Sequence, residues 1–76
     1  MVQSVTKELT ATELENWRLV AEGYSNKEIE SRRNVSHTTL STQLHSLYRK
    51  LGIHDIAVCH NTRALATRMW IERFGL

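Results

Sequence analysis

The chain has 76 residues, enough for one domain with a thin core, since a chain of this size buries only roughly 60% of its unfolded surface. Its single cysteine, Cys59, excludes an internal disulfide, and the absence of both a signal-peptide pattern and a long apolar run predicts a cytoplasmic protein with no membrane association. A formal net charge of +2 is compatible with a nucleic-acid partner without requiring one.

Helices dominate the predicted structure, because the chain has no proline, only three glycines and no sustained alternation of apolar and polar residues. Residues 1–8 show no periodic pattern and predict a flexible N-terminal arm before a single domain over 9–76. Thr10 and Glu13 have the spacing of a capping box, in which a hydroxyl and a carboxylate satisfy free N–H groups at a helix start. They predict a first helix over 11–22 that ends at Gly23.

Two further helices follow closely. Ser25 and Glu28 form a second capping box and predict a short helix over 26–33. Ser36 is suited to cap a third helix over 37–51, which Gly52 ends. One face of this third helix is apolar, at Leu40, Leu44, Leu47 and Leu51. Its other face is polar, which predicts a helix packed on one side and exposed on the other.

The last predicted helix runs from about residue 56 to 74, although residues 56–61 fit either its first turns or a longer loop. It is apolar over more of its circumference than a thin core can cover, which predicts a dimer or partner surface there. That surface comprises Leu65, Met69, Trp70 and Phe74. For Trp17 we expect a place in the core, whereas Trp70 suits the core and an interface equally.

Helices 26–33 and 37–51, joined by a short turn, have the pattern of a helix-turn-helix. In that motif the second helix enters the DNA major groove, where hydroxyl, imidazole and cationic side chains reach bases and phosphates. The pattern favours DNA binding but is not specific to it, because other small helical domains have capped helices with polar faces.

Several segments also resemble a known family. Leu9-Thr10 with Glu13, the run 19–29, Val35-Ser36, Thr39-Leu40 and the run 48–52 are similar in register to the LuxR-type, or GerE-type, DNA-binding domain. The resemblance implies an all-α, four-helix domain that binds double-stranded DNA, commonly as a homodimer paired through its last helix. Because the chain has no room for a receiver or ligand-binding domain, we expect a free-standing regulator of bacterial or phage origin.

The family's residue roles are carried over by position. The resemblance places base reading on Ser41, Thr42 and His45 of the recognition helix 37–51. It places phosphate contacts on Lys27, Thr39, Gln43, Arg49 and Lys50.

The chain departs from the family pattern at two kinds of position. On the recognition helix, Ser41 and Gln43 stand where the family usually has lysine and histidine, and His45 stands where a basic residue is common. In the interior, Asn16 and Arg33 replace apolar residues and Glu30 replaces an alanine. A buried charge without a partner is costly, so we expect Glu30 and Arg33 either to turn outward or to bridge each other. The neighbouring pair Arg32-Arg33 suits a phosphate contact and a solvated surface equally.

The leading hypothesis is therefore a DNA-binding transcription regulator that inserts helix 37–51 into the major groove. The alternative is an anti-regulator that keeps the fold but binds another transcription regulator or RNA polymerase. Loss of basic residues from the recognition helix reduces the counterion-release contribution to DNA affinity and fits this alternative.

Neither a cofactor nor a metal nor catalysis is expected. The four histidines His37, His45, His54 and His60 form no pair with metal-ligand spacing, and the lone Cys59 has no CxxC partner. For Cys59 we expect a packing role rather than a reactive thiol. The chain also lacks a glycine-rich phosphate loop and a pair of carboxylates backed by a base.

Overall fold

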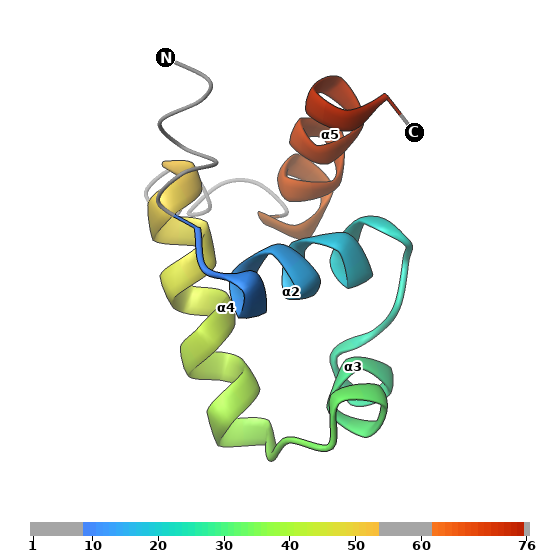
Figure 1. Cartoon of the computed structure of the whole chain (residues 1–76), viewed down its shortest axis with the longest axis vertical. Coiled ribbons are helices and arrows are strands. Elements are labelled where there is room, and N and C mark those ends of the chain that lie inside the picture. The colour runs from blue at the N-terminus through green and yellow to red at the C-terminus, as the bar shows by residue number, and fades with distance from the viewer. Residues whose placement is uncertain (1–8, 54–61, 76) are drawn as a thin grey trace.

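The computed structural model of the chain describes residues 9–53 and 62–75, which form four helices (Figure 1). They are α2 (Ala11–Ala21), α3 (Asn26–Arg33), α4 (His37–Leu51) and α5 (Thr62–Phe74). No strand occurs in this part of the chain, and the predicted all-α class is confirmed. None of these four helices is both long and apolar enough to cross a membrane.

Some sequence predictions fall outside the described residues. They concern the N-terminal arm over 1–8 and the first turns of the last helix over 56–61. The predictions for His54, Cys59 and His60 lie outside the described part as well.

Local side-chain caps determine where α2 and α3 begin. Thr10 Oγ1 accepts a hydrogen bond from the backbone N–H of Glu13 at 3.1 Å, and Glu13 Oε1 accepts one from the backbone N–H of Thr10 at 2.9 Å. Ser25 and Glu28 repeat this arrangement at the start of α3. Both predicted capping boxes are confirmed.

The observed bounds of α3 and α4 equal the predicted ones, whereas α2 ends at Ala21, one residue early. Gly23, with φ +96°, follows this helix in the left-handed conformation. Ser36 caps α4 by accepting the N–H of Thr39, and Gly52 ends it at φ +77°. Left-handed backbone also ends α3, where it falls on Asn34 rather than on a glycine.

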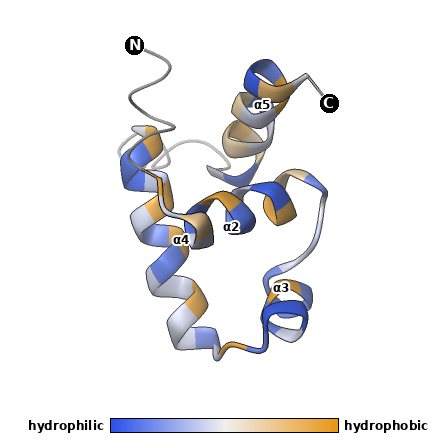
Figure 2. Cartoon of the chain, in the orientation of Figure 1, coloured by the Kyte–Doolittle hydropathy of each residue, from blue (hydrophilic) through white to orange (hydrophobic). Residues whose placement is uncertain are grey.

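Helix α2 crosses the middle of the molecule, with α4 on one side and α5 on the other, while α3 packs near the start of α4 (Figure 1). The predicted leucine stripe of α4 is buried, and hydrophobic and hydrophilic residues alternate around that helix (Figure 2). The core is completed by residues of all four helices and of the segments beside them. Its other buried apolar members are Leu9, Trp17, Leu19, Val20, Ile29, Ile53, Ala66 and Trp70.

Trp17 is the centre of the contact between α2 and α5. It is fully buried, as predicted, and its indole N–H donates to the backbone oxygen of Ala66 at 2.8 Å. The rings of Trp17 and Trp70 meet edge to face, with centroids 5.2 Å apart and an interplanar angle of 80°. Edge-to-face contact is a favourable geometry for aromatic pairs. This hydrogen bond and the edge-to-face ring contact therefore help to hold α5 against α2.

Candidate nucleic-acid interface

Helix α4 presents a continuous polar face opposite its buried leucines. Ser41, Thr42 and His45, the three predicted base-reading residues, are all exposed on this face. They share it with further exposed side chains, namely His37, Thr38, Thr39 and Arg49. Because 3.6 residues make one turn, the leucine spacing of four, three and four leaves these positions pointing away from the core.

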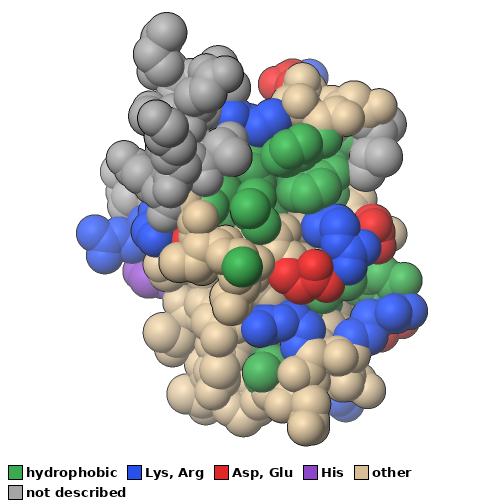
Figure 3. Space-filling view, viewed as in Figure 1, with side chains coloured by type: hydrophobic (Ala, Val, Ile, Leu, Met, Phe, Trp, Pro, Cys, Tyr) green, Lys and Arg blue, Asp and Glu red, His purple; other side chains and the backbone are tan. Residues whose placement is uncertain are grey.

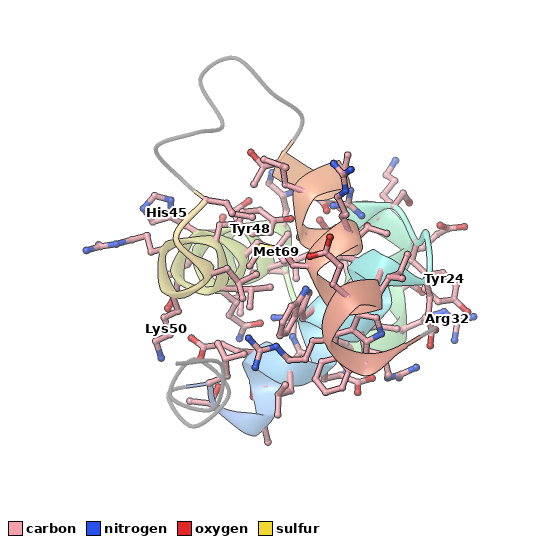
Figure 4. The ribbon with its side chains drawn as sticks, turned by 90° about the horizontal axis from the view of Figure 1, so that it is seen from above. Tyr24, Arg32, His45, Tyr48, Lys50 and Met69 are labelled. Atoms are coloured by element: carbon pink, nitrogen blue, oxygen red, sulfur yellow. The ribbon has the colours of Figure 1, made fainter. Side chains whose placement is uncertain are left out.

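The outward face of α4 is shallowly hollowed in two places. One open hollow is lined by Thr42, His45, Ser46, Arg49 and Lys50. His45 also borders a second hollow, which separates α4 from the start of α5 and whose lining includes Ser41, Tyr48 and Arg63. In the view from above, His45 and Lys50 point outward from α4, whereas Tyr48 and Met69 lie between α4 and α5 (Figure 4).

The predicted phosphate-binding residues are not equivalent. Lys27, Thr39 and Arg49 are exposed. Lys50 is partly buried and its Nζ lies 3.0 Å from Glu13 Oε1, in an ion pair across α4 and α2. Lys50 therefore connects two helices, and its charge is partly compensated within the protein.

Glu13 is a residue of the interface region that sequence reasoning did not assign beyond its cap. Its side chain is buried, and Oε2 accepts a hydrogen bond from Ser46 Oγ at 2.9 Å while Oε1 accepts from Thr10 and Lys50. Burial alone would raise the pKa of Glu13, but the hydrogen bonds from Thr10, Lys50 and Ser46 outweigh it. The pKa lies below its ordinary value of 4.5. The carboxylate thus stays ionised and holds α4 against α2.

Gln43, the fifth predicted phosphate contact, faces the interior edge of α4. Its Oε1 accepts hydrogen bonds from Arg33 Nη1 at 2.6 Å and from Asn16 Nδ2 at 3.2 Å. Arg33 Nη1 also donates to Asn16 Oδ1 at 2.8 Å. The structure therefore separates Gln43 from the other predicted contacts and joins it to α2 and α3.

Arg33 follows neither expected alternative, because it does not bridge Glu30 and does not turn outward. The Glu30 carboxylate instead lies 2.9 Å from Nδ1 of His37, the first residue of α4. Arg33 turns inward, toward the amide oxygens of Asn16 on α2 and Gln43 on α4. Glu30 therefore pairs with a residue at the start of α4 instead. Arg32, the neighbour of Arg33, stacks its guanidinium over the Tyr24 ring at 4.0 Å. The two arginines thus occupy different environments.

The match to known proteins agrees with this geometry. Residues 7–61 match the bacterial regulatory proteins of the luxR family, and this match covers more than half of the chain. The chain belongs to the luxR family. Over 45 residues, 59% of its length, this luxR-family chain is 51% identical to a protein of Mycobacterium bovis and to two of Mycobacterium tuberculosis strains. The name of each of these three proteins describes it as an HTH-type transcriptional regulator.

The matched segment is a small part of these mycobacterial proteins, because the chain spans about 5% of the length of each. No solved structure matches the chain significantly. The family membership nevertheless confirms the predicted LuxR-type fold, since the matched residues include all of α2, α3 and α4.

The surface predicted for a partner is only partly exposed in this luxR-family domain. Trp70 is 9% exposed and belongs to the core, because it packs on Trp17. Leu65 and Met69 are partly buried against the same core. Phe74 is 44% exposed, and Ile71 on the same helix is 45% exposed. Hydrophobic side chains also gather where α5 packs over α2 (Figure 3).

Helix α5 is joined to the helix-turn-helix by Arg63. The Arg63 guanidinium donates to Asn26 Oδ1 at the start of α3 and to the backbone oxygen of Tyr24. Nearby, the Tyr48 hydroxyl is buried without a hydrogen-bond partner among the described residues. Burial raises the pKa of Tyr48, and the charge of Arg63 opposes that shift. Sequence periodicity carried no signal for these contacts, which join residues up to 39 positions apart.

Proposed function

We propose that this chain regulates transcription by binding double-stranded DNA with α4 in the major groove. The observation that carries the proposal is the exposed polar face of α4 around Ser41, Thr42 and His45. A major groove admits one α-helix, and base edges there offer donors and acceptors to short polar side chains. The buried leucines on the opposite face would keep the helix attached to the core while it reads the sequence.

Individual roles follow from exposure. The hydroxyls of Ser41 and Thr42 can each donate and accept, and the His45 imidazole can do either according to its tautomer. Thr39 and Arg49, at the two ends of the same face, and Lys27 on α3 suit phosphates. Lys50 reaches the edge of this face from its ion pair with Glu13. We assign Gln43 to holding α4 in place, because its oxygen is already bound by Arg33 and Asn16.

The proposed interface has few cations, which sets the expected salt dependence. Log affinity falls by about 0.9 per decade of salt for each phosphate neutralised. With Lys27, Arg49 and Lys50 as contacts, the slope should be about −3 for each domain bound, by the same relation. Much of the remaining affinity would then come from contacts to base edges.

We also propose that the chain forms a homodimer through the exposed end of α5, where Ile71 and Phe74 lie. Two-fold symmetry of the protein would then require an operator that is an imperfect inverted repeat.

The test is a fluorescence-anisotropy titration of promoter and random duplexes with the purified chain at two salt concentrations. Preference for some promoters, together with the shallow slope above, is the expected result. Thr42→Ala should reduce the ratio of promoter to random affinity by roughly tenfold, the cost of one lost base contact. Thr67→Ala, on α5, is the matched control and should leave the ratio unchanged.

Flat anisotropy with every duplex would overturn the proposal. Binding of RNA polymerase or of another transcription regulator would then account for the fold, and the exposed Ile71 and Phe74 would be the first residues to substitute. Restoring basic residues by Ser41→Lys and His45→Lys separates the two classes. Under the DNA-binding proposal these changes strengthen DNA affinity, whereas protein partner binding through α5 would not change.

A further inference from the structure

Three polar side chains, one each from α2, α3 and α4, meet where these helices pack together. Arg33 is the last residue of α3, Asn16 lies in the middle of α2, and Gln43 lies next to Thr42 on α4. Arg33 Nη1 is shared by two oxygens, Asn16 Oδ1 at 2.8 Å and Gln43 Oε1 at 2.6 Å. Asn16 Nδ2 closes the triangle by donating to Gln43 Oε1 at 3.2 Å.

Burial makes this triangle more constraining than an exposed contact. Asn16 is fully buried, and Arg33 and Gln43 are partly buried. Polar groups that leave water need hydrogen-bond partners, so alternative positions of these side chains carry a desolvation cost. Among residues 9–53 and 62–75, no carboxylate pairs with Arg33, and both acceptors are neutral amides. The geometry of the triangle, rather than charge pairing, therefore determines where Arg33 lies.

We propose that Arg33 is a positioning residue that sets the rotation of α4 about its own axis. The proposal rests on the DNA-binding function above. Gln43 is one residue from Thr42, and successive residues of a helix lie about 100° apart. Holding the Gln43 oxygen against Arg33 and Asn16 consequently determines the direction in which Thr42 and its neighbours on the polar face point.

Base reading requires α4 to be oriented accurately about its axis, which is why the contact between Arg33 and Gln43 matters. Side-chain tips lie about 6 Å from a helix axis, so a rotation of about 20° moves them by about 2 Å. Direct hydrogen bonds to base edges tolerate only a few tenths of an ångström. The apolar stripe of α4 alone permits small rotations, because leucine packing is non-directional. Directional hydrogen bonds from Arg33 remove that freedom.

The test compares two arginines on the same turn of α3. Arg33→Met removes the triangle but keeps an unbranched chain of similar length. Arg32→Met removes the same charge from the neighbouring residue, which stacks on Tyr24 and does not join the triangle. Both variants lose one positive charge, so both should lose a similar factor in affinity for random duplex. We expect only Arg33→Met to lower the ratio of promoter to random affinity, by roughly tenfold or more.

The outcomes separate this inference from the proposed function. If the unaltered chain shows no promoter preference, the DNA-binding function fails. If the chain discriminates and a folded Arg33→Met variant, checked by circular dichroism, keeps the same ratio, only the positioning role is overturned. Should Arg33→Met not fold, the double variant Asn16→Leu/Arg33→Met replaces two members by apolar groups, which restores packing without the hydrogen bonds. It should fold and still show the lowered ratio.

A second measurement uses the unaltered protein. In proton–nitrogen NMR spectra, the guanidinium protons of Arg33 should be protected from exchange and show cross-relaxation to the side-chain amides of Asn16 and Gln43. Those of Arg32, exposed on its helix, should exchange rapidly. Averaged, rapidly exchanging signals from Arg33 would overturn the proposal without any variant.

Discussion

At the scale of single residues, the Glu13 side chain both caps its own helix and contacts another helix. Its Oε1 completes the capping box of α2 through the N–H of Thr10, a contact three residues long. The same carboxylate binds Ser46 and Lys50 of α4, at separations of 33 and 37 residues. A residue that starts α2 therefore also holds α4 in place.

The ionisation of Glu13 gives the first prediction. Folding lowers its pKa below 4.5, so its contribution to stability is fully present above that value and is lost as the pH falls through the lowered folded pKa. Glu13→Gln should reduce the free energy of unfolding by about 1.5–3 kcal/mol near neutral pH, the range for hydrogen bonds to a charged group. The difference from the unaltered protein should shrink in acid. Urea denaturation at several pH values measures it.

Glu15→Gln is the control for this prediction. Glu15 lies on the same helix but forms an exposed ion pair with Arg18, at 2.6 Å, with side chains 44% and 41% exposed. Exposed pairs contribute little to stability, so its substitution should have a small effect. A Glu13→Gln difference that stays constant from neutral to acidic pH would contradict the assignment.

At the scale of elements, short signals at the helix ends determine the architecture. Hydroxyl and carboxylate caps begin α2 and α3, and left-handed residues end α3 and α4. The two left-handed positions use different residues, Asn34 with φ 56° and Gly52 with φ +77°. Glycine and, to a lesser degree, asparagine adopt this conformation at low cost.

Gly52 gives the second prediction. No atom lies within 4 Å of the Cβ that a side chain would add there, so only backbone strain opposes a substitution. Gly52→Ala should lower the free energy of unfolding by about 1 kcal/mol. Gly52→Asn should cost clearly less, because asparagine tolerates the left-handed region. Equal losses for the two variants in urea denaturation would show that something other than φ limits this position.

At the scale of the whole molecule, α5 covers α2 and leaves part of its own apolar surface exposed. Trp17, Trp70 and Phe74 form one aromatic cluster, in which the ring centroids of Trp17 and Phe74 lie 5.7 Å apart. Trp70 is buried there, but Phe74 and the adjacent Ile71 remain nearly half exposed. Exposed apolar residues next to a core mark a candidate contact between copies of the chain.

This surface gives the third prediction. In sedimentation equilibrium at high micromolar concentration, the chain should self-associate, and Ile71→Ser/Phe74→Ser should weaken that association because it removes the apolar contact. The fold should survive, since neither residue is buried. The conservative control Ile71→Leu/Phe74→Leu should still self-associate. A strictly monomeric profile of the unaltered chain would contradict the proposed dimer.

Sequence patterns predicted those parts of the fold that depend on near neighbours. The capping boxes and the leucine stripe predicted three helices to within one residue at their ends, and the same stripe predicted which face of α4 is exposed. The partners of Arg33 could not be predicted in this way. Arg33 binds Asn16 and Gln43 rather than Glu30 because of how three helices pack together. The sequence left the environment of Trp70 undecided for the same reason, since periodicity shows on which face of a helix a residue lies but not what covers that face.

The hydrogen bond from Trp17 to the backbone of Ala66 has a consequence for synthesis of the protein. It joins residues 49 positions apart, so the contact between Trp17 and α5 cannot form until α5 has been synthesised. Helices α2, α3 and α4 are synthesised before α5 and at that stage lack the contacts that Trp17 makes with Ala66 and Trp70. Tryptophan emission from stalled nascent chains of increasing length should therefore shift to the blue only once residue 66 is released, and this shift reports the moment at which the domain closes.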